Sequence, residues 1–404
     1  MPPAKEGRGA VKGHHPVRID SLAQAQALLR EIGADDFGVK WMAPKAVFRA
    51  VKLKDIPCRA ANIIKQEMLS KGGEAAVRRD AVSGQGSTDV LLLGTLRQYR
   101  ELVGKLALQP FGLKALAEDL SRLLEGLEPA GGRMMPLPGG RQLEVGGRTL
   151  VMGVLNVTPD SFSDGGRYLQ LDAARARAAA MVEEGADLVD VGGMSTRPGH
   201  QVVPAEEELR RVLPVVERLA AELPVPVSVD TNKGEVAAAC LQAGAHLIND
   251  VSGTDPDPAL LQATAAAGAG LIIMHSRRVV DAEQLVDQVV GDLAEAVARA
   301  EAAGVDGARL MVDPGIGFGK TAEQNLEVVR RLYDLQGLGR PVVLGTSRKS
   351  FIGHVLDLPV EERLEGSLAT VAAGIMQGVQ VVRVHDVRAT RRLADMLDRL
   401  RDGG

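Results

Sequence analysis

The fold is decided by the stretch L-V-M-G-V-L-N, residues 150–156, and by seven further runs of the same kind that follow it. Each run is short, rich in valine, isoleucine and leucine, and apolar almost throughout, which is typical of parallel strands buried on both faces. These further runs are ADLVDV (186–191), VPVSVD (225–230), HLIND (246–250), GLIIMH (270–275), RLMVDP (309–314), PVVLGT (341–346) and VQVVRVH (379–385).

The segments between these runs have the apolar spacing of amphipathic helices. In the fifth segment Val286, Val289, Val290, Leu293 and Val297 follow the i, i+3, i+4, i+7 pattern of a helix that buries one face. Eight strand-helix units predict an α/β protein with a (β/α)8 TIM barrel. A doubly wound open sheet is the alternative, but no GxGxxG motif follows the first strand.

A glycine- and proline-rich stretch from Glu128 to Arg148 separates the barrel from the residues before it. Such composition predicts a linker followed by a short hairpin. We therefore expect a smaller α/β domain with its linker over residues 1–138, and the barrel over residues 139–404. Within the first domain, helix-like and strand-like pieces alternate, such as 21–32 and 46–53, but no motif there indicates a chemistry.

Composition favours a small-molecule partner over a nucleic acid or a membrane. The 48 lysines and arginines nearly balance the 52 acidic residues, for a net charge of −4. Cys58 and Cys240 lie far apart and outside any zinc-binding pattern, so neither a disulfide framework nor a zinc site is predicted. No apolar run approaches the roughly 20 residues of a membrane span, and the N-terminus lacks an apolar signal core. The expected compartment is the cytoplasm.

Polar side chains recur at the ends of the predicted strands, the edge at which barrel enzymes build their sites. Asn249 and Asp313 taken singly also fit turn residues. The six polar residues at this edge are Asn156, Asp230, Asn249, His275, Asp313 and His385.

Two of these residues, Asp230 and Asp313, would raise each other's pKa in one cavity unless hydrogen-bond donors separate them. A ligand ring with several N–H groups would do so, with Asn249 giving and accepting a hydrogen bond beside it and Lys349 donating to the ring's acceptors. A purely structural hydrogen-bonding role for the aspartates is the alternative.

The end of the last strand predicts an anion site. Arg383 and His385 point to the same side because side chains alternate along a strand. With Arg197 from the glycine-rich loop at 192–199, they would hold a diphosphate group and stabilise its charge as it leaves; a surface ion pair is the alternative. That loop and the loop at 156–166, which carries Phe162, are expected to be mobile lids.

Two further segments are less specific. G-T-S-R-K-S-F-I-G (345–353) opens a helix near Ser350, where a hydroxyl and free N–H groups would suit a carboxylate. D-P-G-I-G-F-G-K (313–320) resembles a phosphate loop but is not a Walker motif, because no serine or threonine follows Lys320. Its glycines are expected to shape the turn that presents Asp313.

Taken together, five motifs in order resemble dihydropteroate synthase: NVTPDSFSDGG (156–166), STRPG (195–199), DPGIGFGK (313–320), SRKSFIG (347–353) and RVHDV (383–387). The resemblance spans residues 148–401. It implies an enzyme of folate biosynthesis that joins a pterin diphosphate to p-aminobenzoate, that requires magnesium, that is inhibited by sulfonamides and that forms a homodimer.

The resemblance also implies roles for single residues. Asp230, Asn249, Asp313 and Lys349 would hold the pterin, and Asn156 would meet a magnesium ion that the diphosphate also binds. Arg197, Arg383 and His385 would contact the diphosphate and, with Lys349, carry the catalysis. The p-aminobenzoate subsite would be formed by Thr196, Phe162, Pro198 and Ser350.

Two positions depart from the family pattern. Met194 stands where the family usually carries glutamate, and I-I-M-H-S-R-R (272–278) replaces a more familiar M-H-M-Q-G continuation. Methyltransferases that move a methyl group from methyltetrahydrofolate to a corrinoid protein share the pterin-reading residues, but have no use for Arg197, Lys349, Arg383 and His385 toward a diphosphate. A non-catalytic pterin-binding protein is the third reading.

Overall fold

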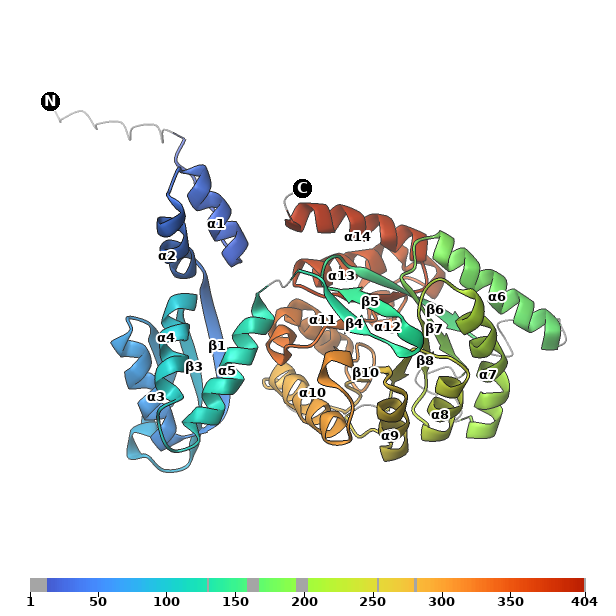
Figure 1. Ribbon diagram of the computed structural model, residues 1–404, viewed down its shortest axis with the longest axis horizontal. Helices are drawn as coiled ribbons and strands as arrows, with labels where there is room; N and C mark the ends of the chain where they lie inside the picture. Colours follow the sequence, from blue (N-terminus) through green and yellow to red (C-terminus); the bar gives the residue numbers. More distant parts are fainter. Residues whose placement is uncertain are drawn as a thin grey trace. The chain divides into compact units, whose positions relative to one another are not determined.

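The structure is a computed structural model that describes residues 13–128, 131–157, 167–193, 203–252, 254–279 and 282–402. The chain divides into two compact units, Met1–Glu128 and Pro129–Gly404 (Figure 1). The expected boundary near Pro138 falls inside the second unit, in the turn of a hairpin described below.

The first unit is a three-stranded antiparallel sheet in the order β1-β3-β2 with helices around it. Alternate residues of β1 are buried, and Tyr99 lies fully buried under the sheet, where its hydroxyl donates to the Leu92 carbonyl at 2.9 Å. The strands are β1 (Phe48–Pro57), β2 (Glu74–Val77) and β3 (Ser87–Thr95), and the α-helices are α1 (Leu22–Glu31), α2 (Asp36–Ala46), α3 (Cys58–Ser70), α4 (Leu96–Leu106) and α5 (Leu113–Leu127).

The second unit is an eight-stranded parallel sheet closed into a barrel. Its order is β11-β10-β9-β8-β7-β6-β13-β12, and a parallel bridge between Val312 and Val342 joins the two ends. The strands are β6 (Leu150–Asn156), β7 (Leu188–Gly192), β8 (Val227–Asp230), β9 (Leu247–Asp250), β10 (Gly270–Met274), β11 (Leu310–Asp313), β12 (Val343–Leu344) and β13 (Val381–Val384). Each coincides with a predicted run, so the predicted (β/α)8 barrel is confirmed.

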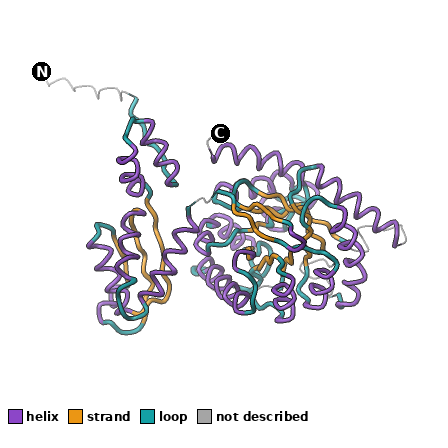
Figure 2. Tube along the Cα trace, viewed as in Figure 1, coloured by secondary structure: helices purple, strands orange, loops and turns teal. Residues whose placement is uncertain are grey.

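Helices surround the barrel and bury their apolar stripes against the strands (Figure 2). In the helix predicted from the fifth segment, Val286, Val289 and Leu293 are buried as the spacing requires. The barrel helices are α6 (Arg167–Glu183), α7 (Ala205–Glu222), α8 (Gly234–Gln242), α9 (Pro258–Ala267), α10 (Leu285–Ala302), α11 (Ala322–Arg330), α12 (Ser350–Leu356), α13 (Leu364–Met376) and α14 (Val387–Asp402).

A hairpin of β4 (Arg133–Pro136) and β5 (Gln142–Val145) closes the end of the barrel opposite the site. Met135 is fully buried and Leu143 nearly so, within one apolar cluster that also contains the first inward-facing residues of the strands, among them Leu150 and Leu247. The hairpin is therefore part of the barrel's core.

No helix within the described ranges is both long and apolar enough to cross a membrane. Cys58 and Cys240 are both buried free thiols.

Candidate functional site

The carboxyl ends of four neighbouring strands bring polar groups to one level of the barrel mouth. Strand register pairs Asn156 with Gly192, Gly192 with Asp230, and Asp230 with Asn249. Because paired residues of parallel strands point to the same side, these side chains line one wall. Gly192 leaves that wall open: a Cβ atom there would lie 3.7 Å from the Asn156 amide oxygen and 3.6 Å from the Asp230 Cβ.

Arg383 of β13 reaches across this wall and holds two carboxylates. Its Nε donates to Asp190 at 2.6 Å and its terminal nitrogen donates to Asp230 at 2.7 Å. The same Asp190 oxygen accepts a hydrogen bond from the Asn249 amide at 3.0 Å. Asp190 is fully buried, and its second oxygen has no hydrogen-bond partner among the described residues. Asp190 therefore orients both Arg383 and Asn249.

Burial dominates the electrostatics of this cluster. It raises the pKa of Asp230 to about 7, with Arg383 opposing the shift and Asp190 adding to it. Burial likewise disfavours the charge of Arg383, but the neighbouring carboxylates of Asp190 and Asp230 outweigh it and raise the arginine's pKa. Such shifts are typical of functional sites.

Asp313 and Lys349 form the opposite wall, held by the turn of the DPGIGFGK segment. The Gly315 N–H donates to one Asp313 oxygen at 2.7 Å. The Lys349 ammonium donates to the Ile316 carbonyl and lies 4.7 Å from the centroid of the Phe318 ring. Burial raises the pKa of Asp313, and burial lowers that of Lys349 to about 8.

Gly345 lies beside both Asp313 and Lys349. A Cβ atom at Gly345 would lie 3.8 Å from an Asp313 oxygen and 3.8 Å from the Lys349 nitrogen, so this glycine opens onto both groups. Asp230, Asn249 and Asp313 each use one polar atom within the protein and keep one side-chain oxygen without a hydrogen bond to any described residue. Three side-chain oxygens at the barrel mouth are thus available to accept hydrogen bonds from a ligand.

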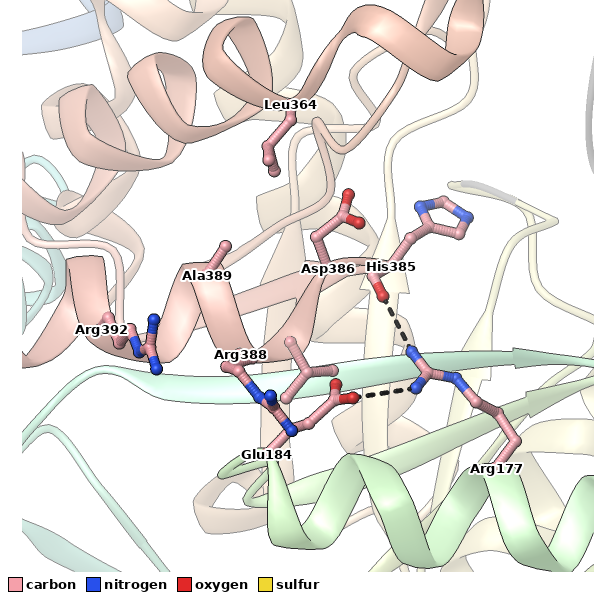
Figure 3. Close-up of a pocket in the computed structure, with 9 residues that line it drawn as sticks. Arg177, Glu184, Leu364, His385, Asp386, Arg388, Ala389 and Arg392 are labelled. Carbon is pink, nitrogen blue, oxygen red and sulfur yellow. Dashed lines mark hydrogen bonds and ion pairs between the residues drawn. The ribbon is translucent and has the colours of Figure 1, made fainter.

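His385 lies at the edge of the mouth and is anchored through its backbone. Its N–H donates to the Ser347 hydroxyl at 3.2 Å, and its Nδ1 lies 3.0 Å from the same oxygen. Arg177 of α6 donates to the His385 carbonyl at 3.3 Å and to Glu184 at 3.2 Å (Figure 3). These two arginine contacts border a hollow of about 380 Å³ between α6 and α14, outside the polar cluster of the mouth.

Several predicted residues lie outside the described ranges: Phe162, Met194, Thr196, Arg197 and Pro198. The described start of the second loop is held firmly, because Arg211 of α7 donates to the Gly193 carbonyl at 3.1 Å. Ser350 is exposed at the first residue of α12, next to Lys349. The backbone before it is fixed by Arg348, whose positive φ of 57° turns the chain and whose guanidinium pairs with Asp386 at 2.5 and 3.0 Å.

The oxygen ligands at the barrel mouth suit a magnesium ion that is bound mainly by water and by substrate phosphates. The described residues hold no group of three or more His, Cys, Asp or Glu side chains suited to a metal. The exposed Asn156 amide oxygen is the protein ligand at hand, beside the open wall at Gly192. Mg²⁺ commonly keeps several waters and binds through one or two protein oxygens plus substrate phosphates, so the residues fit that mode.

Sequence reasoning missed Asp190. Its signal was present, since a charged residue in the middle of the apolar run LVDV has to be paired when both faces of the strand are buried. Arg383, which the sequence placed with His385 at an anion, also pairs with Asp190 and Asp230 through its guanidinium. The remaining Arg383 N–H groups make no hydrogen bond to the described residues.

Comparison with known proteins agrees with this geometry. Residues 152–385 match the family described as pterin binding enzyme. The dihydropteroate synthase of Bacillus subtilis is 50% identical over 257 residues, which cover 64% of this chain and 90% of the relative. A crystal structure of Xanthomonas albilineans dihydropteroate synthase with 4-aminobenzoic acid is 43% identical, covers 66% of this chain and 98% of that chain, and has a TM-score of 0.62.

One relative extends the similarity into the first unit. A probable bifunctional folylpolyglutamate synthase/dihydropteroate synthase of Halobacterium salinarum is 42% identical over 382 residues, which cover 91% of this chain and 45% of the relative. The chain therefore belongs to the pterin-binding enzymes and, within them, to the dihydropteroate synthases.

Proposed function

We propose that this chain condenses 7,8-dihydropterin-6-ylmethyl diphosphate with p-aminobenzoate, giving 7,8-dihydropteroate and pyrophosphate, with the site residues acting as follows. The observation that carries the proposal is the pair of walls at the barrel mouth: Asp230 and Asn249 on one side, Asp313 and Lys349 on the other, with three side-chain oxygens open to a ligand.

The pterin is recognised by hydrogen bonding of its N–H groups to Asp230, Asn249 and Asp313. A buried carboxyl with a pKa near 7 is partly protonated in the empty pocket, and N–H donors of a ligand favour its ionised form. Lys349 donates to the acceptor atoms of the ring. Asp190 keeps Asn249 in the orientation that leaves its amide oxygen toward the ligand.

The diphosphate is held by Arg383, His385 and Arg197. Support comes from the Arg383 N–H groups that remain after Asp190 and Asp230 are bound, and from the half-buried position of His385 directly after β13. Asn156 would hold a magnesium ion through its amide oxygen, and the bound ion would neutralise charge on the diphosphate. The guanidinium groups of Arg383 and Arg197 suit the diphosphate, because arginine and phosphate form strong charge-assisted hydrogen bonds.

The reaction breaks the C–O bond between the pterin methylene and the diphosphate, which leaves with the electron pair. The p-aminobenzoate nitrogen then bonds to that methylene and loses a proton. As the C–O bond breaks before the amine attacks, positive charge develops on the pterin. Asp230 and Asp313, which are ionised when the pterin N–H groups donate to them, lie beside the ring and favour that charge.

The p-aminobenzoate subsite is completed by the two loops, with Thr196, Phe162 and Pro198 around the ring and Ser350 at the carboxylate. Sulfonamides copy the aniline and its anionic end, so they compete there. Because Arg197 of the second loop contacts the diphosphate, sulfonamide binding is expected to be strong with pyrophosphate and magnesium and weak without them. Titration under both conditions tests this; equal affinity would remove the loop residues from the subsite.

We assign the chemistry to residues 139–404, because every matched motif lies there. A homodimer is supported by exposed apolar residues on α12 and α13: Val355, Leu356 and Met376 are 52%, 46% and 53% exposed. Two unpaired cysteines suit the reducing cytoplasm.

The decisive experiment incubates the full chain with the pterin diphosphate, p-aminobenzoate and magnesium, and measures dihydropteroate and pyrophosphate together. Equal amounts of the two products are expected, and Asp313→Asn is the matched inactive control. Folded wild-type protein that forms neither product would refute the proposal.

A further inference from the structure

A chain of three side chains leads away from the pterin walls, at the place where the sequence departs from the family pattern. His275 follows β10 and is fully buried. Its Nε2 lies 3.1 Å from an Asp292 oxygen of α10, and the other Asp292 oxygen accepts from Arg277 at 3.1 Å. On the opposite side of the ring, Nδ1 lies 2.9 Å from the ammonium of Lys320. None of these groups has a part in the reaction described above.

The hydrogen bonds at His275 decide which atoms donate and which accept in the series Lys320, His275 and Asp292. An ammonium group has three N–H donors and no acceptor. Lys320 lies near four acceptors: His275 Nδ1, the Gly315 carbonyl at 3.1 Å, the Phe318 carbonyl at 3.2 Å and, more distantly, the His275 carbonyl at 3.5 Å. The Asp292 carboxylate oxygen accepts from Nε2, so the imidazole proton lies on Nε2 and the Nδ1 lone pair accepts from Lys320, whose pKa is lowered by burial to about 7. Burial lowers the pKa of His275 to about 4, in keeping with a neutral ring.

The two carbonyls belong to the turn that forms one wall of the pterin site. Gly315 donates to Asp313, the Ile316 carbonyl accepts from Lys349, and the Phe318 ring lies against the Lys349 ammonium. The turn passes close to the His275 backbone, since a Cβ atom at Gly315 would lie 1.7 Å from the His275 carbonyl oxygen, and the φ angle of +65° there also favours glycine. Lys320 thus links the turn to His275 through the Gly315 and Phe318 carbonyls. Asp313 and Lys349 contact the same turn through the Gly315 N–H and the Ile316 carbonyl.

We propose that Lys320, oriented by His275 and Asp292, is a positioning residue for pterin recognition: it holds the 315–318 turn so that Asp313 and Lys349 meet the ring. This inference rests on the proposed pterin-binding roles of Asp313 and Lys349. Lys320 itself touches no substrate. Removing it lets the turn relax and misplaces both recognition groups, which weakens pterin binding without altering the p-aminobenzoate subsite.

The test uses the full chain and compares Lys320→Met with the matched control Arg278→Met. Arg278 is an exposed cation on the same segment as His275. Calorimetry with 6-hydroxymethylpterin is expected to show Kd raised roughly 10- to 100-fold for Lys320→Met, in the range seen when a group that orients a ligand-binding side chain is lost. The KM for the pterin diphosphate should rise accordingly, while the KM for p-aminobenzoate and the behaviour of Arg278→Met stay unchanged.

A double-mutant cycle separates positioning from general damage to the barrel. If Lys320 acts through the wall that holds Lys349, the effect of Lys320→Met on Kd should shrink several-fold in a Lys349→Met background. At the other end, Asp292→Leu should weaken pterin binding, and Asp292→Asn should restore it because the amide oxygen still accepts from His275. Asp292 is partly exposed, so the Asp292→Leu and Asp292→Asn variants test the positioning role even if Lys320→Met does not fold.

Full additivity in the cycle, or equal loss of both substrates, would overturn the positioning role. So would an Asp292→Leu variant that binds pterin like the wild type. A wild-type protein that binds no pterin would instead refute the proposed function itself, so the two failures are distinguishable.

Discussion

Replacing Asp190 by asparagine tests whether one buried carboxylate organises the pterin wall. The aspartate is fully buried, and a single oxygen accepts from both Arg383 and Asn249. An asparagine can keep its oxygen in that place, but its NH₂ group must then occupy the position of the second carboxylate oxygen, which has no partner among the described residues. The opposite amide orientation would point NH₂ at two other donors.

The cost follows from two contributions. Loss of the charge weakens the hydrogen bonds from Arg383 and Asn249 by about 1–2 kcal/mol, since charge-assisted bonds exceed neutral ones by about that amount. A buried donor without an acceptor costs about 1–3 kcal/mol more. Asp230 still pairs with Arg383, so no uncompensated cation is created. The free energy of unfolding should therefore fall by about 2–5 kcal/mol, and the pterin Kd should rise at least about tenfold as Asn249 and Arg383 lose their orientation.

Urea unfolding and pterin calorimetry measure the two effects. Asp172→Asn, an exposed aspartate on α6, is the matched control and should leave both quantities unchanged. An Asp190→Asn protein with wild-type stability and wild-type pterin affinity would show that the carboxylate does not organise this wall.

Three further outcomes are expected. A chain beginning at Gly131 should keep the melting temperature of its barrel, whereas one beginning at Leu137 loses the buried Met135 and should melt roughly 5–15 °C lower; equal melting would show that β4 is dispensable. Pterin affinity should fall as the pH rises through about 8, because Lys349 loses its positive charge and one of its three N–H donors, and Lys349→Met should remove that dependence; calorimetry across pH checks both. Gly345→Ala should fold normally, since its Cβ meets neighbours at ordinary distances, yet weaken pterin binding by about 1–3 kcal/mol by filling the cavity; unchanged affinity would move the pterin away from Asp313 and Lys349.

The local properties of the chain were enough to predict the barrel and the level of its site. A strand buried on both faces must be apolar along its whole length, so the run at 150–156 and its repeats are visible without any tertiary information. Strand alternation and parallel register then place Asn156, Asp230 and Asn249 at one edge, as the structure has them. The motif order was specific enough to indicate the family.

The sequence by itself therefore determined the elements, their order and most of the polar groups at the barrel mouth. Only the tertiary structure decided which groups meet. Arg383 binds Asp190 and Asp230, which precede it by 193 and 153 residues. His275 contacts both Lys320 and Asp292, which lie 45 and 17 residues away in the sequence. The tertiary structure also decided that the β4–β5 hairpin, which ends at Val145, packs into the core of the barrel. Such pairings depend on closure of the barrel, which brings distant strands together, and no local periodicity records which side chain will lie opposite which.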